Sequence, residues 1–409
     1  MGKNYADLYN SENDSIALDQ KFFVVEELVR GTLKGPTGAD FIYTLEGGSV
    51  SYTQPFISSP HRSGRHHTSI IKQKKDMSFT IPTYFNIDET LGSASTAEID
   101  PAMRVLMTSM FGKEITSPNL EYSTASEPDL TFSLFENGDK WAYQSRGCFV
   151  QGANMKFPGD GEATSEWTGM GVEALMVSIG KSVTANSGNT VTVATGEGYR
   201  FPVGALVMII HADGTTRSSD TPDGTYRTVT SVAGDVVTLS GAVLTDADGT
   251  TNPVYLCYAE PATPTAINNP VTGLVGAADF AGLSIDCFRN IEINCQNNHE
   301  PVKYCFGSDA LHGRLFVPGS RFTAELSATL NQNAPVVEFY NKLQAFQSQD
   351  FSLRLGSAAG RRLEISLPKV FMQPPSFSVP ASGSIPITFK GNAYQTALDA
   401  ADEITVDFK

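Results

Sequence analysis

The chain has 409 residues, a formal net charge of −15 at pH 7 and only 18% charged residues. This acidic balance argues against a protein that holds nucleic acid by its phosphates, because such binding requires Lys and Arg. The length suits two or three domains, and the abundance of Gly, Ser, Thr and Asn favours a mainly β fold of short strands joined by turns.

The first part of the chain carries strand patterns and a basic loop. Residues 1–20 are polar, and we expect them to form an arm. DFIYTLEGGSVSY (40–52) alternates in the manner of a strand, which places Asp40 and Glu46 on one face. In HRSGRHHTSIIKQKK (61–75), small residues near the middle indicate a loop or hairpin tip. The cations of this loop are Arg62, Arg65, Lys72, Lys74 and Lys75.

A helix is predicted over IDPAMRVLMTSMFG (99–112), where the apolar residues adopt helical spacing. Asp100 suits the N-cap, Pro101 the first turn and Gly112 the C-terminal stop. Around this helix we expect strands at 77–87, 130–135, 140–150 and 163–177.

Residues 180–262 differ from their surroundings in composition. They are rich in Thr, Val and Gly, and short β patterns alternate with turn signals such as Asp-Gly. The segment leads into the Pro-rich stretch PATPTAINNP (261–270), which is typical of a linker. We therefore expect three domains: residues 1–179, a small all-β domain over 180–262, and residues 263–409.

The second half repeats the order of the first. GLSIDCFRNIEINCQNN (282–298) predicts a long strand with Asp286 and Glu292 on its polar face. PVVEFYNKLQAFQ (335–347) has the apolar spacing of a helix. Strands are predicted on either side of it, at 321–330, 351–355 and 361–371.

Two further stretches indicate an internal duplication. FPGDGEATSEWTG (157–169) and VPASGSIPITFKG (379–391) share Pro, Gly, an aromatic residue and a final Gly at the same spacing, offset by 222 (391 − 169). Trp167 and Phe389 are the aromatic pair, and we expect both to be core anchors. The acids Asp40 and Glu46 are spaced by six, as are Asp286 and Glu292, at an offset of 246 (286 − 40).

Catalytic and metal-binding patterns are not found in the sequence. The five cysteines have no CxxC spacing, and without a signal-peptide pattern we expect reduced, buried thiols in a protein made in the cytosol. No nucleotide-binding or nucleophile motif occurs, and the adjacent histidines of the basic loop lack a nearby acid. We expect no enzyme activity, no metal and no cofactor.

These features resemble the tail tube (major tail) proteins of long-tailed bacteriophages. The resemblance is carried by the strand SIDCFRNIEINCQNN, the segment GSDALHGRLFVPGSRFTAEL (307–326), the helix PVVEFYNKLQAF and the closing run to GNAY. In the first half, EIDPAMRVLMTSMFG and GCFVQGANMKFPGDGEATSEWTG (147–169) match them. The resemblance implies two tandem tube domains, each a β-sandwich or half-barrel with one helix.

The resemblance also implies an assembly. Three duplicated subunits would form a ring of six tube domains, as in long non-contractile tails, and stacked rings would form a tube through which double-stranded DNA passes without tight binding. Asp40, Glu46, Asp286 and Glu292 are the candidates for an acidic lumen, which repels phosphate. Arg62, Arg65, Lys72, Lys74 and Lys75 are the candidates for ring stacking, and 180–262 would be an outward decoration.

The implied location is the virion tail, after synthesis in the host bacterial cytoplasm, with no membrane insertion. The implied partners are further copies of the chain, the tape measure, the terminator and the tail tip. Two alternatives stay open at this point. One is another tail component, a terminator or baseplate hub, which caps or joins rings. The other is a β-sandwich surface adhesin that uses 180–262 for binding, against which the odd cysteine count argues.

Overall fold

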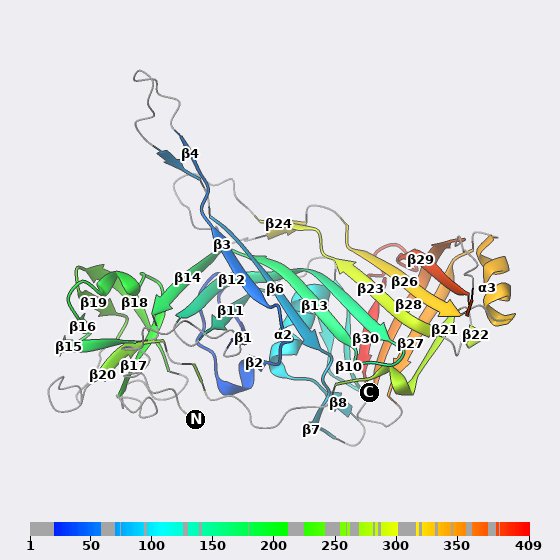
Figure 1. Cartoon of the computed structure of the whole chain (residues 1–409), viewed down its shortest axis with the longest axis horizontal. Coiled ribbons are helices and arrows are strands. Elements are labelled where there is room, and N and C mark those ends of the chain that lie inside the picture. The colour runs from blue at the N-terminus through cyan, green and yellow to red at the C-terminus, as the bar shows by residue number, and fades with distance from the viewer. Residues whose placement is uncertain are drawn as a thin grey trace.

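The computed structural model describes residues 20–58, 70–73, 75–93, 96–125, 130–138, 141–178, 180–211, 225–241, 254–258, 260–261, 270–280, 283–284, 288–301, 316–318, 321–331, 334–344, 347–356, 362–374, 382–383 and 385–409. These residues form a mainly β protein with two α-helices in the described part, so the predicted fold class is confirmed. Figure 1 shows a small barrel at one end, a long sheet across the middle, and a projecting segment that carries β4.

One layer is a row of antiparallel strands, which we call the strand row. In spatial order it contains β3 (Ser49–Thr53), β6 (Asp76–Tyr84), β13 (Thr164–Gly171), β12 (Trp141–Pro158), β23 (Phe288–Gln296), β26 (Thr323–Asn331), β29 (Pro386–Ala393) and β28 (Leu363–Gln373). Only the C-terminal parts of β12 and β28 join the row, and a register shift in the pairing with β11 or β27 separates each from its N-terminal part.

A second layer covers the inner face of the row. Around the N-terminal part of β12 it contains β1 (Lys21–Glu26), β2 (Phe41–Ile42), β11 (Phe132–Asn137) and β14 (Glu173–Ser178). Around the N-terminal part of β28 it contains β21 (Gly276–Phe280), β22 (Leu283–Ser284), β27 (Gln349–Leu355), β30 (Thr405–Phe408), β10 (Leu120–Thr124) and β9 (Gly112–Ile115). A single hydrophobic core joins the two layers.

The two helices lie at matching places in the chain order. α2 (Pro101–Phe111) packs on β1 and β12, and its left-handed end at Gly112 (φ 84°) confirms the predicted stop. Its buried residues are Ala102, Met103, Leu106, Met107, Ser109, Met110 and Phe111. α3 (Ala334–Gln344) packs near β22 and β28, at the end of the molecule opposite the small barrel (Figure 1).

Small hairpins extend from the strand row. β4 (Phe56–Ser58) pairs with β5 (Ile70–Lys72) between β3 and β6. β24 (His299–Pro301) pairs with β25 (Phe316–Pro318) between β23 and β26. A further hairpin, β7 (Asp88–Ser93) with β8 (Thr96–Glu98), precedes α2.

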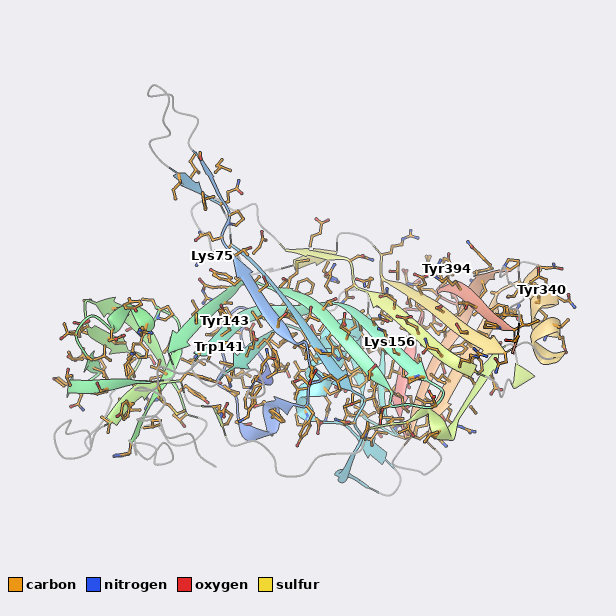
Figure 2. All side chains as sticks on the ribbon, viewed as in Figure 1. Lys75, Trp141, Tyr143, Lys156, Tyr340 and Tyr394 are labelled. Carbon is orange, nitrogen blue, oxygen red and sulfur yellow. The ribbon has the colours of Figure 1, made fainter. Side chains whose placement is uncertain are left out.

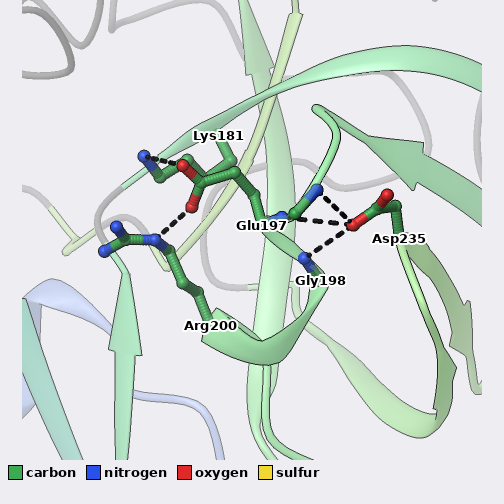
Figure 3. A network of polar contacts seen from close by, with 6 residues as sticks. Lys181, Glu197, Gly198, Arg200 and Asp235 are labelled. Atoms are coloured by element: carbon green, nitrogen blue, oxygen red, sulfur yellow. Dashed lines mark hydrogen bonds and ion pairs between the residues drawn. The ribbon is translucent and has the colours of Figure 1, made fainter.

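The barrel lies within the residues expected to form a separate small domain. Its strands are β15 (Lys181–Ser187), β16 (Thr190–Val193), β17 (Leu206–His211), β18 (Arg227–Ala233), β19 (Val236–Leu239) and β20 (Val254–Cys257), and they close on themselves. A polar network stabilises its loops (Figure 3). Asp235 accepts hydrogen bonds from the N–H groups of Gly196 and Glu197. The carboxylate of Glu197 in turn forms ion pairs with Lys181 and Arg200.

The barrel is not a separable appendage, because its core continues into the first half of the second layer. Phe135 of β11 stacks on Tyr258, with ring centroids 5.5 Å apart. Gln144 of β12 is fully buried and bonds both backbone groups of Leu206, donating to its carbonyl at 2.8 Å and accepting from its N–H at 2.7 Å. The expected outward decoration therefore shares a core with the first half of the chain.

Two strand predictions need correction. The continuous strand expected over 40–52 is wrong, because Gly38–Asp40 is a 3-10 helix and Glu46 lies in a turn with Gly47 at φ 98°. The strand expected over 163–177 is divided at Val172 into β13 and β14. β30 was not predicted at all, although it pairs with both β28 and β10.

Candidate assembly surfaces

The two halves of the strand row repeat one another in register. Val150 of β12 lies opposite Gly169 of β13, and Met372 of β28 lies opposite Gly391 of β29, an offset of 222 in both strands (372 − 150 and 391 − 169). Trp167 and Phe389, the predicted core anchors, are both 0% exposed. Each glycine closely approaches a carbonyl of the neighbouring strand, that of Phe149 in β12 or of Phe371 in β28.

The first strands of each half also correspond. Phe79 of β6 pairs with Gly169 and Leu326 of β26 pairs with Gly391, so β6 and β26 are equivalent at an offset of 247 (326 − 79). Val50 of β3 faces Phe79 and Ile293 of β23 faces Leu326, so β3 and β23 are equivalent at an offset of 243 (293 − 50). The hairpin strands that follow, Phe56–Ser58 and His299–Pro301, obey the same offset (299 − 56). The first repeat is thus β3, β6, β13 and β12, and the second repeat is β23, β26, β29 and β28.

The repeats are joined by pairing of β12 with β23, which we call the internal junction. Seven residues of each strand pair, from Gly152 opposite Gln296 to Pro158 opposite Asn290. At its end the N–H of Asn297 donates to the carbonyl of Gln151 at 2.7 Å. The ring of His299 covers Phe149, with centroids 5.9 Å apart, so Phe149 is 5% exposed.

A second contact joins the repeats in the other layer. β10 of the first half pairs with β30 near the C-terminus. Beside it the buried hydroxyl of Thr124 donates to Glu403 at 2.6 Å. The two halves therefore form one body, held edge to edge in both layers.

The outer ends of the strand row lack the partner that the internal junction provides. In the described residues β3 pairs with β6 alone, and residues 371–373 of β28 pair with β29 alone. Phe371, the equivalent of Phe149, is 42% exposed, and it contacts Tyr394, which is 48% exposed. Lys75 near one end and Tyr394 near the other lie far apart along the molecule (Figure 2).

The hairpin of β4 and β5 carries an exposed apolar stem. Phe56 is 64% exposed, and Ile57, Ile70 and Ile71 are each exposed by about half. Of the predicted stacking cations, Arg62, Arg65 and Lys74 lie outside the described residues, and Lys72 ends β5. Lys75 is at the hairpin base, where it pairs with Glu173 at 2.6 Å. Burial alone would lower the pKa of Lys75, but hydrogen bonds to Glu173 and Tyr52 raise it to about 12.

The predicted lumen residues do not share one strand face. Asp40 is half-buried and accepts hydrogen bonds from the N–H and hydroxyl of Thr37, both 2.7 Å long. Glu46 is exposed in its turn, and Asp286 lies outside the described residues. Glu292 is on the outer face of β23, directly opposite Lys156 of β12, which Figure 2 labels. The pairing of Asp40 and Glu46 with Asp286 and Glu292 is therefore not a strand equivalence.

The outer face of the strand row is rich in hydroxyl and amide side chains. One line across it runs through Glu166, Asn154, Asn294, Glu325 and Asn392 on successive strands. The charged residues of this face in the described strands are Asp76, Glu166, Glu292 and Glu325 with Lys156, Arg289 and Lys390. Most of these residues were not predicted from the sequence, although the alternation in TSEWTGMG and TAELSATLN marks their outward positions.

Other kinds of site find no support in the described part. Within it, no group of His, Cys, Asp or Glu could hold a metal ion, and neither helix is long and apolar enough to cross a membrane. Cys148, Cys257 and Cys295 are buried and form no disulfide, and burial raises the pKa of the Cys148 and Cys295 thiols. Comparison with known proteins found no matching family model and no matching curated protein.

Proposed function

We propose that this chain is a structural subunit that assembles head to tail into rings, and that the rings stack into a phage tail tube. One observation carries the proposal. The strand row contains one junction between its two repeats, and it leaves the equivalent edges of β3 and β28 without a strand partner in the described residues. Unpaired edges promote association, and a head-to-tail contact between unlike ends closes into a ring or continues as a fibre.

The expected ring has three subunits, because the resemblance implies six tube domains per ring and each subunit contains two repeats. The lumen is the outer face of the strand row, where described carboxylates and cations are nearly balanced among many hydroxyl and amide groups. Such a face offers no cluster of cations to phosphate, so double-stranded DNA passes without tight binding. The role is structural rather than catalytic, and the location is the virion tail.

Ile57, Ile70 and Ile71 of the exposed apolar stem are the candidates for contact between rings. An apolar surface that projects from the body is stabilised when a partner covers it. In the complete tail the rings would meet the tape measure inside and the terminator and tail tip at the ends.

Electron microscopy and sedimentation velocity of the full chain at rising concentration test this function. Three-fold rings and stacked tubes are expected, and a persistent monomer would contradict the proposal. Single rings that never stack would favour the terminator or hub alternative. The variant Ile57→Ser with Ile71→Ser removes two paired, exposed stem residues and should yield rings without tubes, whereas tubes that still form would show that the stem does not connect rings.

A further inference from the structure

We propose that the end of β3 in one copy joins the end of β28 in a second copy in the register of the internal junction, with Phe56 packed on Phe371. This inference rests on the proposed ring and specifies the contact that closes it. Its occupant is another copy of this chain, because the two complementary ends are the first and last strands of the strand row.

The register follows from the two offsets. Adding 222 to the β12 side and subtracting 243 from the β23 side converts the internal pair Gly152–Gln296 into Pro374 and Thr53 (152 + 222 and 296 − 243). The internal bond from the N–H of Asn297 to the carbonyl of Gln151 becomes a bond from Gln54 to Gln373. The accepting position is Gln in both repeats, and Gln54 and Gln373 are exposed.

The aromatic pair follows the same conversion. In the internal junction, Phe149 and His299 cover each other and are 5% and 6% exposed. Their equivalents at the open ends are Phe371 and Phe56, which are 42% and 64% exposed. Tyr394 enlarges the receiving surface, since its ring meets that of Phe371 edge-on at 5.4 Å. Burial of these rings between copies removes apolar area from water on both sides.

The first half of the β3 edge is closed within the chain, which limits the extent of the contact. The N–H of Val50 donates to Glu136 at 2.9 Å, and Gln20 donates to the carbonyl of Gly48 at 2.9 Å. Strand pairing between copies is therefore centred on residues 52–56, where these side chains do not reach. The segment that follows Pro374 lies outside the described residues.

Disulfide cross-linking tests the register in the assembled full chain. Directly opposite residues of an antiparallel pair have Cα atoms about 4.5–5.5 Å apart, which suits a disulfide. The variant Thr53→Cys with Pro374→Cys should therefore form covalent species up to a trimer on oxidation. The off-register variant Ser49→Cys with Pro374→Cys should not, and Gly152→Cys with Gln296→Cys should cross-link within one chain as a positive control.

The outcomes separate the contact from the function. Rings that cross-link through Ser49→Cys but not through Thr53→Cys would overturn the register and leave the ring intact. Absence of rings in the unmodified chain would overturn the proposed function itself. As an independent check, Phe371→Ser should raise the concentration needed for assembly by about tenfold or more. Its thermal unfolding should be unchanged, because Phe371 is exposed in the single chain.

Discussion

Phe149 and Phe371 occupy the same position in two copies of one strand pattern, yet the first is buried and the second is exposed. The difference lies in their surroundings, since β23 and His299 cover the first and no described strand covers the second. The internal junction therefore shows, within one chain, the geometry that we propose for the contact between the edges of β3 and β28 in two chains. Matched substitutions in the two repeats can break or sharpen this conclusion.

The largest effect is expected from removal of the barrel, which shares its core with the second layer of the first half and has no counterpart among the described residues of the second half. Deletion of 180–262 would uncover Phe23, Phe135 and Val177, which share its core. We expect loss of soluble folded protein, measured by expression yield and circular dichroism, and a soluble variant with native unfolding would contradict the shared core. The milder Gln144→Ala leaves both backbone groups of Leu206 unpaired and should cost about 1–3 kcal/mol for each.

The second prediction compares the two phenylalanines directly. Phe149→Ala should destabilise the chain by about 3–5 kcal/mol, because it empties a buried site. Phe371→Ala should change the free energy of unfolding by less than about 1 kcal/mol in the unassembled chain. Denaturant unfolding at low protein concentration measures both. Equal losses would show that Phe371 is already buried in the single chain, and the comparison would fail.

The third prediction compares the two glycines that follow the core anchors. A Cβ at Gly169 would lie 2.2 Å from the Phe149 carbonyl oxygen, and one at Gly391 would lie 2.8 Å from that of Phe371. Gly169→Ala and Gly391→Ala should each cost about 1–3 kcal/mol through strand displacement, with the larger loss at Gly169. Unfolding of the two variants under identical conditions provides the check. Neutral substitutions at both positions would remove the close strand approach from the repeat.

The sequence predicted what depends on local signals. α2 was found because Asp100, Pro101 and Gly112 bracket a clear helical face, and the equivalence of Trp167 and Phe389 was found because a turn motif precedes each. The strand at 40–52 failed because its alternation continues through the turn at Gly47. The true equivalent of Ile293 is Val50, and only the pairing of each with β6 or β26 reveals it.

The contacts between the two halves of the chain were harder to predict, because local signals do not specify them. The internal junction and the contact of β10 with β30 join segments far apart in the chain, and no local pattern encodes such pairs. The position of Lys156 directly opposite Glu292 likewise follows only from the register of β12 and β23. A face expected to be acidic from one strand is therefore nearly balanced when its neighbours are included.

The smallest effect is expected at the bases of the hairpins β4–β5 and β24–β25, where different side-chain contacts stabilise the two repeats. Lys75 corresponds to Phe322 at the offset of 247 that relates β6 to β26 (326 − 79), and Lys75 binds Glu173 while Phe322 packs near Phe111. Lys75→Met should cost about 1 kcal/mol or less at neutral pH, as partly exposed ion pairs do. Phe322→Ala should cost at least as much through lost packing.

The dependence on pH distinguishes these two fastenings. The folded pKa of Lys75 is raised from 10.5 to about 12, so its contribution is complete below pH 10.5 and is lost as the pH rises through about 12. The difference in unfolding free energy between the parent chain and Lys75→Met should therefore be constant from about pH 7 to 10 and shrink above that range. The difference for Phe322→Ala should not follow this course, because no titrating group is removed. A parallel decline for both variants would place the pH sensitivity elsewhere in the chain and remove the contrast between the two hairpin bases.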